Sequence, residues 1–124
     1  MEILNDKAAL LGAAQRKQEV VEVEPGKGVV VIEIGASAYY ELLADQQFWN
    51  EGEDGKKTLN MVKMSPHIAA ASLANADGTC AGISVEEFLT LGRVQQDTII
   101  AAAFRVNGLV GDNEKNSEAS PEDS

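Results

Sequence analysis

The chain has 124 residues, enough for one domain with a real hydrophobic core but too few for two. Its 20 acidic residues against 10 basic ones give a formal net charge of -10, which repels phosphate backbones and anionic membranes and argues against nucleic-acid binding. Aromatic residues make up only 5% of the chain within an apolar fraction of 44%, so aliphatic side chains and alanine must build most of the core.

Cysteine usage and the lack of long apolar runs indicate the compartment. Cys80 is the only cysteine, so no internal disulfide can form. The N-terminus does not combine positive charge with an apolar run typical of a signal peptide, and no segment approaches the roughly 20 apolar residues of a membrane span. We therefore expect a soluble protein of a reducing cytoplasm.

The first third of the chain predicts a short helix followed by a β-hairpin. Leu4, Ala8 and Leu11 recur at helical spacing. Valines then alternate with glutamates at 21–24, and an apolar run at 29–34 resumes after Pro-Gly-Lys-Gly, a sequence that favours a turn. This hairpin would have one apolar and one acidic face, and the apolar face needs a helix or another chain's sheet against it.

The middle of the chain predicts two helices separated by a loop. Ser37 can cap a helix over 38–48. The stretch 50–57 has no apolar residue and two glycines, which predicts a solvated loop. A helix of mostly Ala and Ser is expected over 66–75, because its first residue is proline, which gives up no needed donor there. It stops at an Asn-Ala-Asp-Gly turn.

Two further helices are expected before the C-terminal tail. Ser84 and Glu87 have the spacing of a capping box, after which Val85, Phe88 and Leu89 should form a buried stripe. The last helix should end in a left-handed cap at Asn-Gly, which follows its final residue. This helix is expected over 94–106, with Ile99, Ala103 and Val106 on one face and Ile100 and Phe104, the expected core aromatic, beside them.

The composition changes near residue 111, after which acidic, Ser, Asn and Pro residues dominate and predict disorder. The expected organisation is therefore a helical domain with an N-terminal hairpin over 1–110 and a disordered acidic tail over 111–124. The expected fold class is mainly α, a compact bundle of short helices.

The sequence contains no set of residues typical of a catalytic or metal-binding site. His67 and Cys80 each occur once, which excludes a His/Cys zinc site within one chain. We interpret them as a half-exposed histidine at a helix start and a small buried thiol. An EF-hand reading around Gly82 fails because Phe88 would occupy the twelfth position, where an acidic ligand is required. We expect no enzymatic activity and no cofactor.

An aromatic cluster gives the candidate binding residues. Tyr39, Tyr40, Phe48 and Trp49 lie within eleven positions of one another. They can be core with one exposed ring, or a patch that contacts a partner, because aromatic anchors are enriched at interfaces.

The order of turns and helices in the last part of the chain resembles a known family. From residue 65 the chain reads Ser-Pro-His-Ile-Ala-Ala-Ala-Ser-Leu-Ala-Asn-Ala-Asp-Gly, then Ile-Ser-Val-Glu-Glu-Phe-Leu, then Ala-Ala-Ala-Phe-Arg-Val-Asn-Gly-Leu and Glu-Lys-Asn-Ser. This order resembles the tail assembly chaperones of long-tailed, lambda-like bacteriophages. The resemblance covers 65–116 and extends more weakly to 20–49.

The resemblance implies a non-enzymatic, oligomeric protein of viral morphogenesis. It implies a chaperone that binds the long tape measure protein in the cytoplasm of the infected host, helps recruit tail-tube subunits and is absent from the mature virion. In the family, a programmed frameshift near the end of the short product adds a domain that contacts tail-tube protein. Lys115 and Asn116 mark a possible frameshift position, since Glu-Lys-Asn can be encoded by GAA AAA AAC.

Two other functions are compatible with the sequence. One is a small head-to-tail joining or tail-completion protein that stays in the particle. The other is an acidic regulatory inhibitor that mimics nucleic acid, which the net charge of -10 favours. A gene for a very long helical tape measure protein directly downstream would favour the chaperone.

Overall fold

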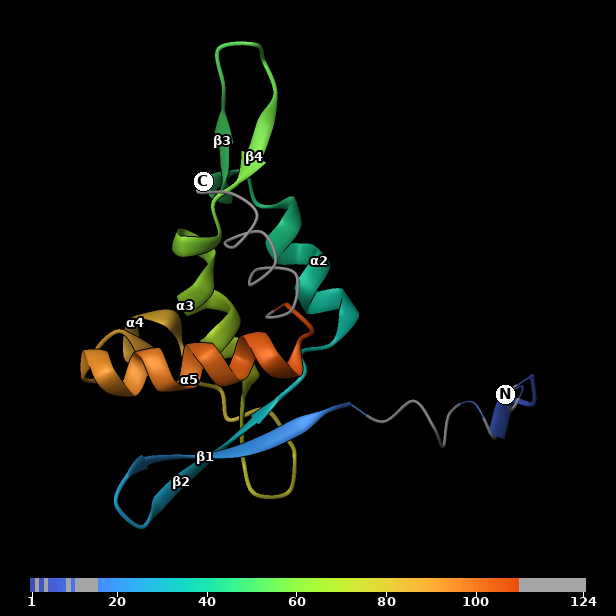
Figure 1. The fold of residues 1–124 in the computed structure, drawn as a ribbon, viewed down its shortest axis with the longest axis vertical. Helices are drawn as coiled ribbons and strands as arrows, with labels where there is room; N and C mark the ends of the chain where they lie inside the picture. Colours follow the sequence, from blue (N-terminus) through green and yellow to red (C-terminus); the bar gives the residue numbers. More distant parts are fainter. Residues whose placement is uncertain (2, 4, 9, 11–15, 110–124) are drawn as a thin grey trace.

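The computed structural model describes residues 1–109 except 2, 4, 9 and 11–15 (Figure 1). The expected disordered tail lies outside the described residues, as does much of the expected first helix. The elements in chain order are β1 (Gln18–Glu24), β2 (Lys27–Ile32), α2 (Ala36–Ala44), the 3-10 helix η1 (Gln46–Phe48), β3 (Trp49–Glu51), β4 (Lys57–Leu59), α3 (Met61–Ser72), β5 (Leu73–Ala74), α4 (Val85–Phe88) and α5 (Arg93–Val106).

The prediction of a mainly α bundle is wrong, because the fold combines helices with two small sheets. One sheet has three strands in the order β1-β2-β5, and the other pairs β3 with β4. Helix α5 lies across the first sheet, whereas the β3–β4 hairpin projects from the opposite end of the molecule (Figure 1). Three short strands that the sequence did not reveal, β3, β4 and β5, account for the difference.

The N-terminal hairpin is confirmed, and a helix covers its inner face. Val21 pairs with Val29 and Glu19 with Val31, so these residues share the face that packs against α5. Val21 and Val31 are buried there. The two-residue turn needs a positive φ, which Gly26 supplies at 76°. Helix α5 therefore provides the cover that an isolated hairpin lacks.

The outer face of the hairpin is not simply acidic. Val20 pairs with Val30 and Gln18 with Ile32 on this face, and Val20 is 67% exposed. The predicted acidic face is thus a mixed one, on which apolar residues from both strands lie beside Glu22.

Helix α3 begins five residues earlier than predicted and contains its proline. The Asn60 side chain caps the helix, its Oδ1 accepting from Lys63 N at 3.0 Å. Inside the helix Pro66 cannot donate to the carbonyl of Val62. The Ser65 hydroxyl donates to that oxygen instead, at 3.0 Å, so the interior proline leaves no unsatisfied acceptor.

The chain leaves α3 to become a strand. Leu73 pairs with Val31 and Ala74 with Val30, which adds β5 to the sheet. The helix predicted to continue to residue 75 therefore ends at Ser72. The expected Asn-Ala-Asp-Gly turn is confirmed, with Gly78 N donating to Asn75 O at 2.9 Å.

The stretch 50–57 is a hairpin and not a loop. Trp49 pairs with Leu59 and Glu51 with Lys57, and the residues between them are exposed as predicted. The opposite charges of Glu51 and Lys57 favour this cross-strand pairing although the segment lacks an apolar face.

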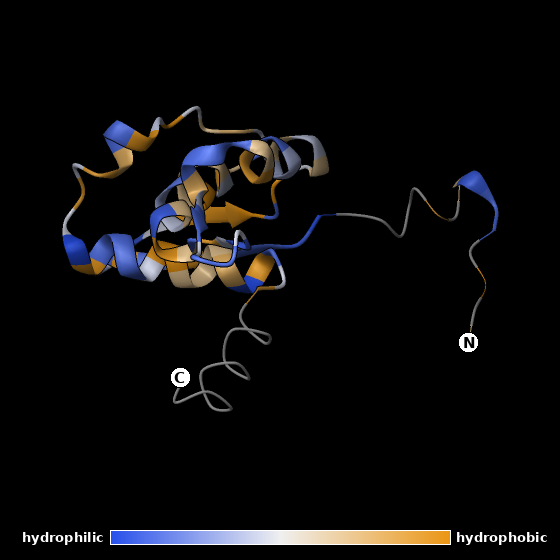
Figure 2. Cartoon of the chain, turned by 90° about the horizontal axis from the view of Figure 1, so that it is seen from above, coloured by the Kyte–Doolittle hydropathy of each residue, from blue (hydrophilic) through white to orange (hydrophobic). Residues whose placement is uncertain are grey.

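The core lies between the first sheet and helices α3, α4 and α5, and Figure 2 shows apolar residues gathered there. Leu89, expected to be buried, is 52% exposed, and Phe104 is only half-buried. The predicted face of α5 is confirmed, since Ile99, Ala103 and Val106 are buried. The largest fully buried side chains are Phe48, Phe88, Met64, Ile68, Ile99 and Val31.

The C-terminal end of α5 joins three elements through one amide side chain. Asn107 Oδ1 accepts from Ile34 N at 3.0 Å, and its Nδ2 donates to Ser72 Oγ at 3.1 Å and to Ala103 O at 2.7 Å. The predicted left-handed cap follows at Gly108, whose φ is 74°. The last turn of α5 is thereby fixed to the end of α3 and to the segment after β2.

Candidate functional site

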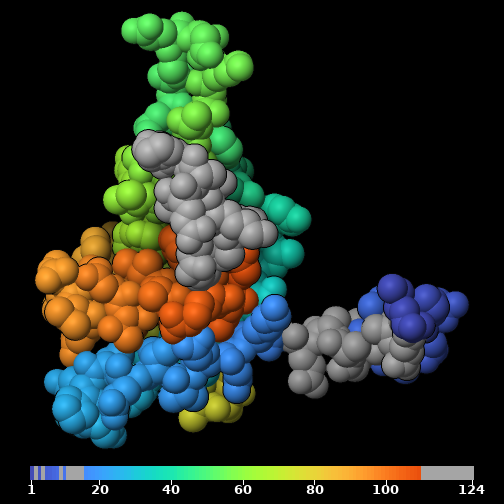
Figure 3. Space-filling view, in the orientation of Figure 1, coloured from blue at the N-terminus to red at the C-terminus, as the bar shows by residue number. Residues whose placement is uncertain are grey.

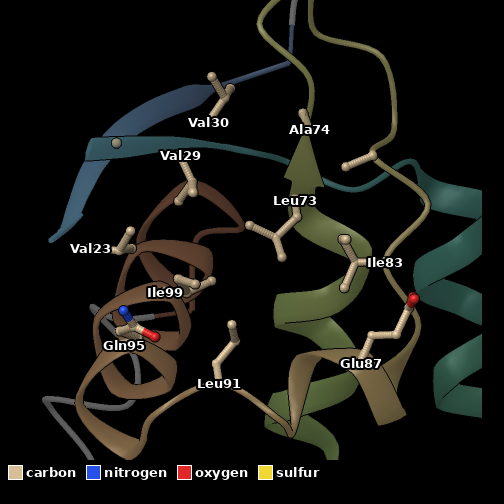
Figure 4. Close-up of a pocket in the computed structure, with 12 residues that line it drawn as sticks. Val23, Val29, Val30, Leu73, Ala74, Ile83, Glu87, Leu91, Gln95 and Ile99 are labelled. Atoms are coloured by element: carbon tan, nitrogen blue, oxygen red, sulfur yellow. The ribbon is translucent and has the colours of Figure 1, made fainter.

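An apolar groove of about 420 Å³ lies between the hairpin and the α4–α5 segment. Figure 4 shows side chains from the sheet, from α5 and from the α4–α5 connection pointing towards one another across it. The groove is lined by Val23, Gly28, Val29, Val30, Leu73, Ala74, Ala81, Ile83, Glu87, Leu91, Gln95 and Ile99.

Several separate segments of the chain build the walls of the apolar groove. Val29 comes from β2, Leu73 from β5 and Ile99 from α5 (Figure 4). Between them lie the two connections on either side of α4, the first of which carries Ile83 and the second Leu91. These two side chains are 37% and 36% exposed, so the rim of the groove presents apolar surface to solvent.

Side-chain hydrogen bonds hold the rim in place. Gln96 Nε2 donates to Leu89 O at 3.2 Å and to Leu91 O at 2.8 Å, which ties the α4–α5 connection to the first turn of α5. The predicted capping box is confirmed on the other side, where Glu87 N donates to Ser84 Oγ at 3.0 Å and Glu87 Oε1 accepts from Ser84 N at 2.9 Å. The groove is therefore preformed by local contacts.

The polar side chains that line the groove have structural partners. Glu87 belongs to the capping box of α4, and Gln95 Oε1 accepts from Gly92 N at 3.3 Å at the start of α5. The groove accordingly offers apolar contact and no paired acid and base. Such a surface suits an apolar side chain of a partner better than a polar substrate.

The four aromatic residues expected to form a contact patch lie away from the groove and are not equally accessible. Phe48 is fully buried, with its ring edge-on to His67 at a centroid distance of 4.7 Å. Trp49 is half-buried, and its Nε1 donates to Leu43 O at 2.6 Å. Tyr39 packs against the core, which leaves Tyr40, at 66% exposed, as the accessible ring.

The remaining candidate residues are spread over the fold. His67 is half-buried inside α3, whereas Cys80 is exposed and not the buried thiol that was expected. Within the described ranges, no group of three or more His, Cys, Asp or Glu side chains is arranged to hold a metal ion. Lys115 and Asn116 lie outside the described residues.

Sequence reasoning missed the apolar groove, although one signal for it exists. The short connections on either side of α4 carry Ile83, Leu89 and Leu91, an excess of apolar residues for segments that mostly lie outside helices and strands.

Comparison with family models, with curated proteins and with solved structures finds no match to this chain. In the described part of the chain, no helix has the length and apolar character required to cross a bilayer.

The turn beside the groove contains a carboxylate whose ionisation depends on hydrogen bonds from one residue, Thr79. The hydroxyl and the backbone N–H of Thr79 donate to Asp77 Oδ1 at 2.6 and 3.0 Å, and these bonds lower the pKa of Asp77. Since its pKa is depressed in the folded state, its stabilising effect is present above about pH 4 and is lost as the pH falls through the folded-state pKa.

We expect Thr79→Val to raise the pKa of Asp77, because the hydroxyl donor is lost while the backbone donor remains. An NMR pH titration of the side-chain carboxyl carbons measures this shift. The pKa of Asp45, which is lowered by hydrogen bonds from Gln47, serves as the internal control and should not move. An unchanged Asp77 titration would show that the hydroxyl bond has no effect on the carboxylate.

Proposed function

We propose that this protein is a non-enzymatic tail assembly chaperone of a long-tailed phage, which binds the tape measure protein in the host cytoplasm. The observation that carries the proposal is the preformed apolar groove, open at Ile83 and Leu91, on a strongly acidic protein. An aggregation-prone helical client can place apolar side chains in such a groove, and the excess negative charge keeps the complex soluble.

The order of elements also supports the proposal. A helix rich in small residues, α3, leads to the Asp-Gly turn, followed by the short α4 and by α5, which ends at Asn-Gly. This is the order on which the resemblance to the tail assembly chaperones rests. A frameshift-extended form would meet tail-tube subunits through its added domain, and neither form would remain in the mature virion.

The test is co-expression with the tape measure protein encoded by the same phage, with its soluble fraction as the measurement. We expect Leu91→Glu to lower that fraction at least severalfold, because a charge placed at the rim opposes entry of apolar side chains. Val62→Glu, at an 85% exposed position of α3 that does not line the groove, should behave like the unmodified protein.

Two results would refute the proposal. One is a tape measure protein that is no more soluble with this partner than without it. The other is equal solubilisation by the Leu91→Glu and Val62→Glu variants, which would separate the function from the groove. Detection of the chain in purified virions by mass spectrometry would favour a structural joining or completion protein instead.

A further inference from the structure

Among the described residues, the three-stranded sheet has one covered edge and one open edge. On the β5 side, Ala74 forms a bridge with Cys80, and Ala81 N donates to Leu73 O at 3.0 Å. On the other side is β1, which in the described part of the chain pairs with β2 alone. Figure 3 shows β1 along the lower surface of the molecule, below α5. An open edge of this kind is a template for another strand.

The pairing with β2 determines which backbone groups of β1 point outward. Glu33 N donates to Lys17 O at 2.8 Å, so the hydrogen-bonded pairs within the hairpin involve the odd-numbered residues of β1 up to Val21. The N–H and C=O groups of Gln18, Val20 and Glu22 therefore point to the open edge. The register shift between Glu22 and Glu24 ends this regular stretch.

An apolar row crosses the outer face of the sheet and stops at this edge. Ala74 lies opposite Val30, and Val30 lies opposite Val20, so the three side chains form one row across three strands. Val20, the last member, is 67% exposed. A further strand with an apolar residue opposite Val20 would continue the row and bury this side chain.

We propose that β1 pairs antiparallel with β1 of a second copy, with the two Val20 residues directly opposite each other. The apolar row then runs without interruption through both copies, in one sheet of six strands. Gln18 lies opposite Glu22 and Glu19 opposite Val21, so no like charges face each other within the regular stretch of β1. The surface is an interface between copies, whether or not the protein is a chaperone.

Neighbouring registers are less favourable by the same criteria. Centring the pair on Glu19 would place two glutamates opposite each other, and centring it on Val21 would place each Val20 opposite Glu22. In the proposed register, Glu19 lies opposite Val21, and its carboxylate is already held by Arg105 Nε and Nη2 at 3.1 and 2.5 Å. The charge pattern of β1 thus selects the register centred on Val20.

Cysteine cross-linking tests the register. In a Cys80→Ser background, Val20→Cys should form a disulfide-linked dimer under a mild oxidant, because opposed residues of a hydrogen-bonded pair have Cα atoms about 5.5 Å apart. Gln18→Cys is the matched control. In the proposed register the two substituted side chains, one from each copy, would lie four positions apart along the strands, about 13 Å, and should not cross-link. Cross-linking of Gln18→Cys in preference to Val20→Cys would overturn the register.

Sedimentation velocity over a range of protein concentrations tests the interface itself. The unmodified protein should show a reversible monomer–dimer equilibrium. Val20→Pro should weaken it at least tenfold, because the N–H it removes points outward and takes no part in the hairpin. Val20→Lys should also weaken the dimer, because it places two positive charges opposite each other. Val62→Lys should leave the equilibrium unchanged. Circular dichroism checks that each variant is folded.

A protein that sediments as a monomer at every concentration up to several hundred micromolar would overturn the proposal. Dimerisation that survives both folded Val20 variants would also overturn it, since the interface would then lie elsewhere. If Val20→Pro fails to fold, the Val20→Lys variant and the cross-linking pattern decide the question. If the protein dimerises but does not bind the tape measure protein, the result would count against the chaperone function alone and not against the proposed interface.

Discussion

Phe88→Ala should lower the free energy of unfolding by about 3–5 kcal/mol. Phe88 is 0% exposed and is the buried residue of α4, a helix of only four residues that packs against α3. Removing the ring leaves a cavity that so short a helix can fill only by moving as a whole. Urea denaturation followed by circular dichroism measures the loss.

Phe104→Ala is the matched control for this prediction. Phe104 lies on α5 at the edge of the core and is half-buried, so its removal gives up less buried surface and can expose the new gap to water. We expect a loss well below that of Phe88→Ala. A larger loss at Phe104 than at Phe88 would contradict the assignment of Phe88 to the centre of the core.

Asn107→Ala should cost about 2–4 kcal/mol of stability, a large effect for a side chain that is not apolar. The substitution leaves the Ile34 N–H and the fully buried Ser72 hydroxyl without their amide partner. Unsatisfied groups of this kind carry their full desolvation cost once water is excluded. The measurement is again urea denaturation, combined with amide hydrogen exchange at Ile34.

Two variants separate this network from the general effect of removing an amide. Asn75→Ala removes an exposed side chain that bonds only within its own turn, and it should cost much less. Asn107→Asp keeps the acceptor for Ile34 N but loses the donors to Ser72 Oγ and Ala103 O, so it should not restore full stability. Equal losses for Asn75→Ala and Asn107→Ala would refute the role of the network.

Features that depend on neighbouring residues could be predicted from the sequence. The hairpin around Gly26, the capping box of Ser84 and Glu87, and the end of α5 at Gly108 all rest on contacts within a few positions. In each case, backbone geometry allows few alternatives, so the residue types indicate the structure directly.

Features that depend on distant parts of the chain could not be predicted from the sequence. Nothing near Leu73 indicates that α3 ends there, because the reason is the vacant edge of β2. Pro66 marks a helix start in most contexts, but here Asn60 caps the helix earlier and the Ser65 hydroxyl compensates for the missing donor. The fold class was mispredicted because short strands were assigned to a helix and to a loop.

The candidate site was missed for a related reason. The apolar groove draws on the hairpin, β5, the α4–α5 connection and α5, and no periodic pattern links these segments in the sequence. The aromatic cluster was visible as a cluster, yet burial divides it, since Phe48 is in the core while Tyr40 is exposed. Proximity in sequence indicated a common neighbourhood but not a common surface.

The position of α5 has a consequence for the order in which the protein is made. The hairpin is synthesised before α5, the helix that covers its valines. During that interval the valines of β1 and β2 lack the cover that α5 later provides. Glu19, Glu22 and Glu24 then act as gatekeepers, because their charges oppose aggregation of nascent hairpins until α5 emerges and Arg105 engages Glu19.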